Sequence, residues 1–411
     1  MKNENENEIN VGVVTSTYAR SEDDCQVPWM RELIVQMKNY PCNIRVLAPA
    51  FKGLKSHSID GVPVHRFRYA PKSIETLTHD EGAPNKVRSL FFQLLAIPYI
   101  LMGALSVLWW CVKFKIQVLH VHWPFPHGLY AILPKYLLGV KIVAMSHGAE
   151  LAIARRSRPV HKVLSWLLGS ADVRCTNSSH TASEVARVSG CKDSVILPYG
   201  ATVRCKSGTL EPLKKPLLLF CGRLVQRKGI DVLLNALPKV LESIDVDVVI
   251  TGEGDRKLEW EKLSDELGLS EVVKFPGFVS DEELSRLYAS CSIYVHPAIY
   301  DDNGDTEGLG VVLIEALSNK KPVIASNVGG IPDVIHNGET GLLVEEKNEQ
   351  ALTDAILKLL NNKTLCSELG EAGYLHVTRF FDWERIAKET YEVYASLTST
   401  VELKINTYEK A

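Results

Sequence analysis

The sequence has little of what marks several specialised classes of protein. The 411 residues include 46 basic and 49 acidic side chains, so a formal charge of -3 offers no basic excess for a nucleic-acid backbone. The nine cysteines are odd in number and contain no C-x-x-C, which argues against both a disulfide framework and a zinc site. Hydrophobic residues at 46% and charged residues at 23% are typical of a soluble globular protein.

The N-terminus also lacks the apolar core of a signal peptide. It begins MKNENENEIN, a polar stretch in which acidic and amide residues alternate. We therefore expect a cytoplasmic protein, with the inner face of the membrane as a second location because of one apolar segment further along.

That segment, residues 90–112 (LFFQLLAIPYILMGALSVLWWCV), contains no charged residue and is long enough to span a bilayer. It lies between two strand-like segments that should share a sheet, whereas a span would place them on opposite sides of the membrane. We favour a long, partly buried helix. Peripheral contact of its apolar side with a membrane is the second interpretation, and a transmembrane span is the third.

The chain begins with the pattern of a doubly wound α/β domain. A valine-rich run at 9–15 predicts a buried parallel strand, an amphipathic helix follows at 28–39, and a second strand is predicted at 44–48. The loop between the first strand and the helix, 16–27, contains no glycine. Its acids Glu22 and Asp23 are candidates for binding acceptor hydroxyl groups, or they belong to a solvated loop.

The second half holds an acidic, glycine-bearing loop before an apolar helix. Glu307, Gly308, Leu309 and Gly310 lead into this helix, and Glu315 lies about two turns further on. Glycines allow a ligand to approach the backbone, and a helix N-terminus favours an anion. The two carboxylates are too far apart to share one proton, so we interpret them as contacts to two parts of one long ligand.

Cations lie at the start of another helix in this half. Arg223 follows a predicted strand at 217–221, and Arg227 and Lys228 lie just before a helix predicted to begin at Ile230. Side chains and helix dipole would act together on a pyrophosphate. Gly252, at the exit of the next predicted strand, is a further candidate for lining the ligand site.

These motifs resemble those of the family-4 retaining glycosyltransferases, the glycosyl transferases group 1. The resemblance rests on E-G-L-G-V-V-L-I-E-A at 307–316, on G-R-L and R-K-G at 222–229, and on G-G-I-P at 329–332. It implies a GT-B fold, in which two doubly wound, Rossmann-like domains face each other across a cleft. The expected domains are 1–205, on the acceptor side and completed by a helix within 380–411, and 206–379, which binds the nucleotide sugar.

The resemblance also implies roles for individual residues. Glu307 would bind the donor sugar and Glu315 the ribose, while Arg223 and Lys228 would hold the departing diphosphate. In the first domain, His147 would support the sugar or the leaving group. The further residues implied are the donor contacts Gly308, Leu309 and Gly310, the base contacts Phe278 and Val279, and the acceptor contact Glu150. The family's paired glycine is missing from loop 16–27, which puts phosphate contact from that loop in doubt.

The expected activity is the transfer of a sugar from a UDP- or GDP-sugar to an acceptor hydroxyl, in polysaccharide or glycolipid assembly. The acceptor would be a sugar, a glycolipid or a small molecule. We expect no metal and no cofactor, because no D-x-D motif lies where a metal would be held. His120 and His122 share a strand face, but no further ligands accompany them. The alternatives are an epimerase or phosphorylase of the same fold, or a non-catalytic protein that binds sugar nucleotides.

Overall fold

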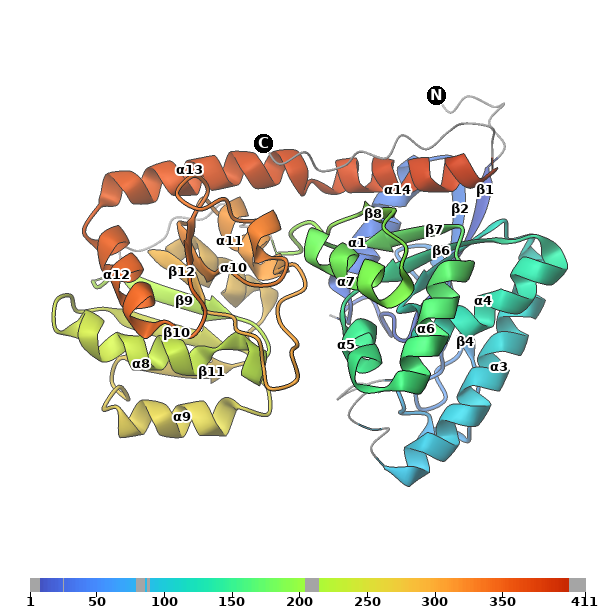
Figure 1. Cartoon of the computed structure of the whole chain (residues 1–411), viewed down its shortest axis with the longest axis horizontal. Coiled ribbons are helices and arrows are strands. Elements are labelled where there is room, and N and C mark those ends of the chain that lie inside the picture. Colours follow the sequence, from blue (N-terminus) through green and yellow to red (C-terminus); the bar gives the residue numbers. More distant parts are fainter. Residues whose placement is uncertain (1–7, 25, 79–85, 87–88, 204–213, 399–411) are drawn as a thin grey trace. The chain divides into compact units, whose positions relative to one another are not determined.

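The computed structural model describes residues 8–24, 26–78, 86, 89–203 and 214–398, and the chain forms two compact units (Figure 1). We call Met1–Pro198 with Trp383–Ala411 the N-terminal unit, and Tyr199–Asp382 the C-terminal unit. The units divide between 198 and 199 and between 382 and 383, against predicted boundaries at 205/206 and 379/380.

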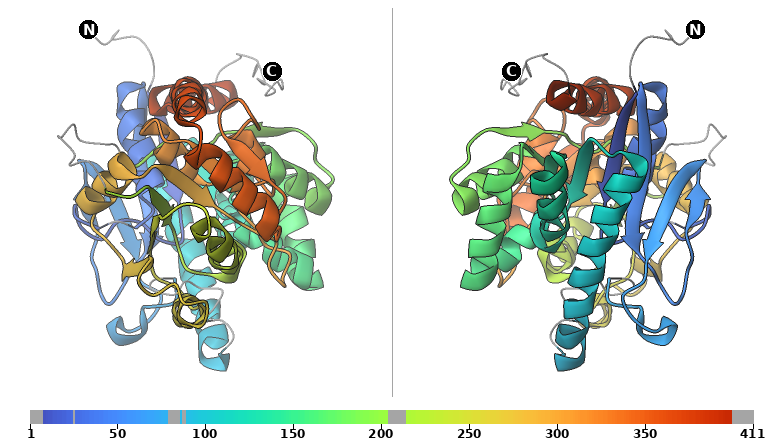
Figure 2. Two further views of the ribbon diagram at one scale, coloured as in Figure 1. Left: turned by 90° about the vertical axis from the view of Figure 1, so that its left-hand side faces the viewer. Right: turned by 90° about the vertical axis from the view of Figure 1, so that its right-hand side faces the viewer.

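The N-terminal unit is built on an eight-stranded sheet of order β3-β4-β2-β1-β5-β6-β7-β8. The neighbouring strands pair in parallel except β3 and β4, which are antiparallel. The central strands are apolar because helices cover both faces (Figure 2). The strands are β1 (Ile9–Val14), β2 (Cys42–Pro49), β3 (His57–Ile59), β4 (Val62–Phe67), β5 (Val118–His122), β6 (Lys141–Ser146), β7 (Val173–Thr176) and β8 (Ser194–Ile196).

The helices of this unit include one from the far end of the chain. α14 (Trp383–Thr398) packs on α1, and the Tyr394 hydroxyl lies 2.6 Å from Nδ1 of His120. α4 begins at Pro124, directly after the end of β5, where proline is tolerated in the first turn. The helices are α1 (Pro28–Gln36), η1 (Met37–Asn39), η2 (Lys72–Ile74), α3 (Leu90–Phe114), α4 (Pro124–Leu138), α5 (Ala149–Arg156), α6 (Arg158–Ser170) and α7 (Ser179–Ser189).

The long apolar segment forms α3, which has one buried face and one exposed face. Tyr99, Val107 and Trp110 are buried against the unit, whereas Leu94 and Leu101 are about 60% exposed. The helix connects β4 to β5, which lie in the same sheet, so a span that separates these two strands is excluded. By length and composition α3 is the one helix among the described residues that could cross a membrane.

The C-terminal unit has a six-stranded parallel sheet of order β11-β10-β9-β12-β13-β14. Its strands are β9 (Leu217–Cys221), β10 (Asp247–Thr251), β11 (Val273–Gly277), β12 (Ile293–His296), β13 (Val323–Ser326) and β14 (Leu342–Val344). The helices are η3 (Gln226–Lys228), α8 (Ile230–Leu241), α9 (Lys257–Glu266), α10 (Asp281–Ser290), α11 (Val311–Ser318), η4 (Ile331–Asp333), α12 (Glu349–Leu360) and α13 (Lys363–Phe380).

Both sheets have a point where the strand order reverses. In the N-terminal unit it lies between β1 and β5, and in the C-terminal unit between β9 and β12. In open α/β sheets, ligands bind beyond the carboxyl ends of the strands at such a point. The prediction of two doubly wound units is confirmed. A ligand site is expected at these two sheet edges.

Close packing of α3 on α4 leads to a first prediction. A Cβ at Gly103 of α3 would lie 2.4 Å from the Tyr130 ring of α4, whereas a Cβ at Gly169 of α6 would meet nothing within 4 Å. We expect Gly103→Val to lower the free energy of unfolding by about 2 kcal/mol, because the two helices must separate. The matched variant Gly169→Val should lower it much less. Urea unfolding measures both, and equal stability of the two variants would contradict this packing.

Candidate active site

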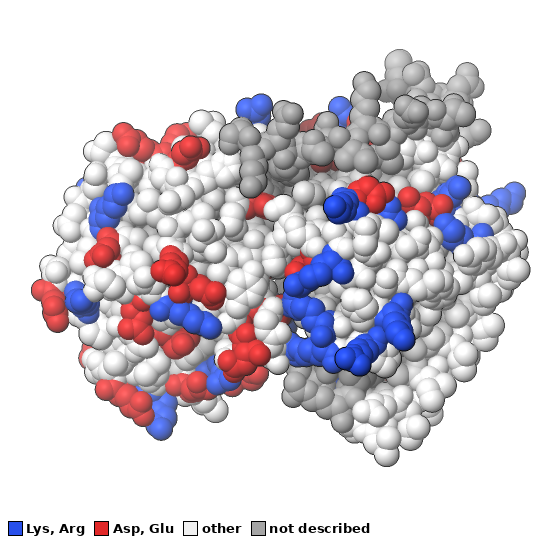
Figure 3. Space-filling view, in the orientation of Figure 1, with Lys and Arg blue, Asp and Glu red and all other residues white. Residues whose placement is uncertain are grey.

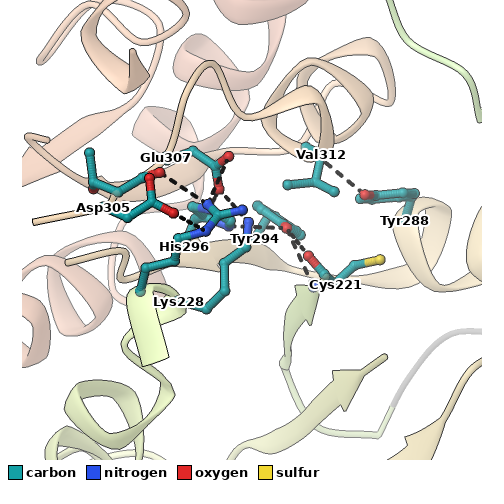
Figure 4. Close-up of polar contacts among 10 residues, drawn as sticks. Cys221, Lys228, Tyr288, Tyr294, His296, Asp305, Glu307 and Val312 are labelled. Atoms are coloured by element: carbon teal, nitrogen blue, oxygen red, sulfur yellow. Dashed lines mark hydrogen bonds and ion pairs between the residues drawn. The ribbon is translucent and has the colours of Figure 1, made fainter. Parts of the chain in front are cut away.

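A buried cluster of charges lies beyond β9 and β12 in the C-terminal unit (Figure 4). The Glu307 carboxylate forms an ion pair with Nζ of Lys228. Nε2 of His296, the last residue of β12, lies 3.1 Å from the same carboxylate, and Nη1 of Arg227 lies 3.4 Å from its other oxygen. Arg227 also donates to the carbonyl of Thr306 at 3.2 Å. The structure thus brings two of the predicted site residues, Glu307 and Lys228, into direct contact.

Two glycines of the recognised motifs allow the backbone segments beside this cluster to approach each other closely. Gly329, with φ +57°, lies against the backbone of Glu307, where a Cβ would be 2.1 Å from the carbonyl oxygen. The next amide, of Gly330, donates to that carbonyl at 2.9 Å. Gly229, with φ +62°, follows Lys228, and a Cβ there would be 2.0 Å from the oxygen of Pro297. Only glycine combines these backbone angles with such close approach.

The charges of the cluster determine how its groups titrate. Burial alone would raise the pKa of Glu307, but Lys228 and Arg227 overcome that effect and hold the pKa well below its ordinary value. Burial, with Lys228 second, lowers the pKa of His296 to about 4. At neutral pH Glu307 is therefore a carboxylate and His296 is uncharged. A carboxylate with so low a pKa is a poor proton acceptor and suits hydrogen bonding to hydroxyl groups.

The other predicted donor contacts surround this edge of the sheet. Arg223, at the exit of β9, is exposed, and desolvation together with the charge of Arg227 lowers its pKa. The amide of Gly252, after β10, donates to the carbonyl of Gly277 at 2.8 Å. Phe278, which follows β11, is 72% exposed and Val279 is half-buried. The predicted segment Gly308, Leu309 and Gly310 connects Glu307 to α11. The ligand roles of these residues stay predictions.

Glu315, one turn inside α11, is enclosed in a second network. Its Oε1 accepts hydrogen bonds from the Thr202 hydroxyl at 2.7 Å and from the amides of Thr202 and Val203 at 3.3 Å. Its Oε2 accepts from the Tyr288 hydroxyl at 2.9 Å. Burial raises the pKa of Glu315, and these hydrogen bonds oppose that effect. The two glutamates therefore lie in separate surroundings, one cationic and one composed of neutral donors.

The corresponding edge of the N-terminal unit holds histidines and tryptophans. His147 follows β6, and its Nε2 lies 3.0 Å from Nδ1 of His122, the last residue of β5. The rings of Trp29 and Trp123 lie 5.1 and 4.5 Å from the His147 ring. Burial lowers the pKa of His147 to about 3. At neutral pH His147 is therefore an uncharged hydrogen-bonding group beside aromatic surfaces.

His120 and His122 each contact a polar side chain within the unit. His120 contacts Tyr394 and His122 contacts His147. Burial lowers the pKa of His120 to about 3. Across the part of the chain that the structure describes, no group of three or more His, Cys, Asp or Glu side chains could hold a metal ion.

The predicted acceptor residues take part in contacts within the unit. Oε1 of the buried Glu150 accepts from the amide of His147 at 2.9 Å, and burial raises the pKa of Glu150 to about 7. Glu22 accepts from Nη2 of Arg31 at 2.8 Å and from the amide of Asp60 at 3.0 Å. Asp23 is exposed in the same loop. Acceptor binding by these three residues stays a prediction.

Several site residues were not singled out by sequence reasoning. Arg227 was expected only as a cation for the pyrophosphate, and its contact with Glu307 was not predicted. His296 could have been found as a polar residue ending an apolar strand beside the switch point. Thr202 and Tyr288 carry no such signal, because their contact with Glu315 joins positions far apart in the sequence.

Comparison with known proteins shows the family to which the chain belongs. Residues 29–201 match the family profile described as Glycosyltransferase Family 4, and residues 206–376 match Glycosyl transferases group 1. A phosphatidyl-myo-inositol mannosyltransferase of Mycobacterium leprae is 31% identical over 303 residues, which cover 71% of this chain and 76% of the relative. The protein belongs to the group 1 glycosyltransferases, and it is a hexosyltransferase of class EC 2.4.

Two further relatives show how far the likeness extends. A GDP-mannose-dependent alpha-(1-6)-phosphatidylinositol monomannoside mannosyltransferase of Mycobacterium tuberculosis is 32% identical over 60% of this chain and 67% of its own length. An uncharacterised glycosyltransferase of Methanocaldococcus jannaschii is 34% identical over 178 residues, which cover 43% of this chain and 44% of the relative.

Solved structures confirm the GT-B class of fold. A sucrose-phosphate synthase from Thermosynechococcus elongatus superposes with a TM-score of 0.75 and 20% identity over 96% of this chain and all of that one. The Anabaena protein HepE, in complex with UDP and glucose, superposes with a TM-score of 0.71 and 16% identity over 95% of this chain and all of that one.

The raised pKa of Glu150 leads to a prediction about stability and pH. The folded unit keeps this proton up to about pH 7, whereas the unfolded carboxyl group loses it near its ordinary pKa of 4.5. Between these values the folded state binds more protons, so the contribution of Glu150 to stability falls as pH rises. As pH rises from 4.5 to 7.5, the free energy of unfolding of Glu150→Gln should therefore increase by roughly 3 kcal/mol relative to that of the wild type.

Urea unfolding followed by tryptophan fluorescence measures this difference. Glu392→Gln, at an exposed glutamate of α14, provides the baseline for losing one surface charge. A difference between Glu150→Gln and the wild type that does not change with pH would contradict the raised pKa.

Proposed function

We propose that this enzyme transfers a sugar from a nucleotide-diphosphate sugar to an acceptor hydroxyl with retention of the anomeric configuration. The observation that carries the proposal is the buried cluster of Lys228, Arg227, His296 and Glu307 at the switch point of the C-terminal sheet. It combines a carboxylate for sugar hydroxyl groups with cations for a diphosphate.

The donor diphosphate would bind beside the cations. Lys228 and Arg227 are already paired with Glu307, and the exposed Arg223 is placed to meet the ligand from solvent. α8 begins at Ile230, directly after these cations, so its N-terminus adds positive potential. Fixed cations that meet a charge developing on the leaving group are worth several kcal/mol in the transition state. They can supply the charge stabilisation for which other transferases use a metal, and we propose a reaction without a metal or cofactor.

Retention of the anomeric configuration is compatible with the protonation states of Glu307 and His147. Glu307 is held as a weakly basic carboxylate, so we assign it to binding the donor sugar and not to proton transfer. The acceptor oxygen would bond to the anomeric carbon on the face from which the diphosphate departs. As the carbon–oxygen bond to phosphate breaks, the acceptor proton would pass to the departing phosphate oxygen. His147 remains neutral and would hydrogen-bond the sugar or the leaving group.

For the acceptor we propose a glycolipid or a related membrane-bound sugar in cell-surface assembly. Two relatives are named as mannosyltransferases of phosphatidylinositol lipids, and others as phosphatidylinositol N-acetylglucosaminyltransferase subunits of Saccharomyces cerevisiae. Action on such a lipid from the cytoplasm would place the enzyme at the inner face of a membrane. One relative is named as dependent on GDP-mannose and HepE holds UDP, which supports a UDP- or GDP-sugar as the donor.

Donor binding and turnover test the site directly. A thermal-shift screen of UDP-, GDP- and ADP-sugars should give one class of nucleotide that raises the melting temperature by mass action. Glu307→Ala and Arg223→Ala should each lower turnover by about a hundredfold or more. As matched controls, Glu282→Ala and Arg286→Ala remove members of an exposed ion pair on α10 and should leave turnover unchanged.

The assay should follow nucleotide release with and without acceptor. Release only when acceptor is present distinguishes a transferase from an epimerase or phosphorylase. A donor that binds but is never consumed would favour the non-catalytic alternative. Near-normal turnover of either alanine variant would overturn the assignment of the site.

The network at Glu315 leads to a prediction about donor affinity. If Glu315 binds the ribose, the Thr202 hydroxyl competes with the ribose for the same Oε1. Thr202→Val keeps the shape of the side chain and removes this donor, so donor affinity should increase by about three- to tenfold. Thr202→Ser keeps a hydroxyl and should bind like the wild type. Calorimetric titration with the donor measures the effect, and weaker binding of Thr202→Val would show that Thr202 instead orients Glu315 for the ribose.

A further inference from the structure

Three neighbouring helices of the N-terminal unit, α3, α4 and α6, expose a continuous apolar surface. α3 packs against α4 and α4 against α6, and the right-hand view of Figure 2 shows the side of the unit on which they lie. We call this surface the apolar face. Its large exposed side chains are Leu90, Phe91, Leu94, Ile97, Leu101, Met102, Leu105, Trp109 and Val112 of α3, Leu133, Tyr136, Leu137 and Leu138 of α4, and Trp166 of α6.

The apolar face is too large to be an ordinary feature of a soluble surface. On α3 the exposed residues recur every three or four positions, from Leu90 to Val112, so they form one stripe along the helix. The opposite stripe is buried in the unit. Single exposed apolar side chains are common, but a contiguous patch of this kind marks a contact with a protein or a membrane.

The three helices of the apolar face carry charge of one sign. α3, α4 and α6 contain no aspartate or glutamate, although the chain has 49 acidic residues. Arg158, Lys162 and Trp166 are four residues apart on α6, so two exposed cations and an exposed tryptophan share one side of that helix. We call this row the basic stripe. In Figure 3, Lys and Arg side chains gather beside a broad surface without charge in this unit.

A cation also borders the other end of the apolar face. Nζ of Lys113 lies 4.5 Å from the centre of the Trp109 ring, and Lys115 is exposed just after the helix. A long aliphatic stem on an apolar surface, with its ammonium group at the border, is the arrangement seen where side chains reach lipid headgroups. Tryptophan and tyrosine prefer that same boundary.

We infer that the N-terminal unit docks on an anionic lipid bilayer, with the apolar face in the headgroup–acyl boundary and the basic stripe on the headgroups. This goes beyond the proposed transfer reaction and does not depend on it. The burial of one side of α3 against the sheet means that the helix lies on the membrane and does not cross it.

The topology relates this surface to the candidate active site. Helices that connect parallel strands run opposite to the strands, so α3, α4 and α5 begin at the edge where His147 lies. Arg158 opens α6 directly after α5. Docking through Leu90, Phe91 and Leu94, at the start of α3, would bring a lipid-linked hydroxyl group to the same edge of the sheet as His147.

A bilayer fits this surface better than a second copy of the chain. A symmetric dimer places the same patch of both subunits in one interface. The basic stripe of each copy would then lie in an interface to which these helices bring no acidic side chain. A protein interface of standard size also carries about ten hydrogen bonds, whereas the apolar face exposes almost entirely hydrocarbon and aromatic side chains. Anionic lipids supply both the apolar phase and the countercharge.

Flotation of the full chain with lipid vesicles tests the inference. The protein should float with vesicles of phosphatidylcholine and phosphatidylglycerol, and much less with phosphatidylcholine alone. High salt should weaken this binding, because exposed charges are screened. Leu94→Glu with Leu101→Glu should lower the bound fraction at least tenfold on both vesicles. Arg158→Gln with Lys162→Gln should lower binding about tenfold on the anionic vesicles only.

Matched variants in the C-terminal unit distinguish binding through this surface from non-specific binding to vesicles. Leu258, on α9, is 80% exposed, so Leu258→Glu makes the same exchange elsewhere and should not change flotation. Lys262→Gln with Arg286→Gln is the corresponding control for charge. Circular dichroism checks that each variant is folded.

Other outcomes would overturn the inference. Equal binding to both vesicles, insensitive to salt, would remove the role of the basic stripe. If the wild type binds no vesicle and sediments as a dimer that Leu101→Glu converts to a monomer, the apolar face is an interface between copies. Nucleotide release with a soluble acceptor is measured without vesicles, so failure of docking and failure of the transfer reaction are distinguished.

Discussion

The buried ion pair between Lys228 and Glu307 is the interaction on which the rest of the C-terminal unit depends. Placing two charges out of water costs several kcal/mol per ion unless geometry and further hydrogen bonds compensate. Here His296 and Arg227 complete the partners of the carboxylate, and the glycines at 229 and 329 allow the two loops to meet. A cluster that is costly to bury, and whose members come from the ends of β9 and β12, is expected to serve binding and not stability alone.

The carboxyl edges of the two sheets carry side chains suited to different ligands. The C-terminal edge has buried charges, with Glu307 kept ionised by its neighbours. The N-terminal edge carries less charge, because burial lowers the pKa of His147 to about 3 and raises that of Glu150 to about 7. One edge therefore suits an anionic ligand, and the other suits uncharged hydroxyl groups. This division follows from which side chains end the strands, since both sheets have the same doubly wound plan.

The helix α3 shows how one composition can serve two environments. Its buried side fills the space between the sheet and α4, where Gly103 faces Tyr130. Its exposed side is as apolar as the buried one, so its residues show little difference between the two faces. Such a helix satisfies the composition of a membrane span, a core helix and a surface-bound helix equally well. Only the packing of its two sides distinguishes among them.

The sequence by itself determined the fold class, the family and the choice of Glu307 and Lys228 as site residues, because apolar strands, helix starts and glycine motifs are local patterns. It did not reveal that Lys228 and Arg227 meet Glu307, that α4 begins at Pro124, or that Thr202 and Tyr288 enclose Glu315. The contacts depend on which loop ends meet when the sheet forms, and they join positions 27 to 113 residues apart. Likewise, the tertiary structure decided which side of α3 is buried, since neighbouring helices and not local propensity cover it.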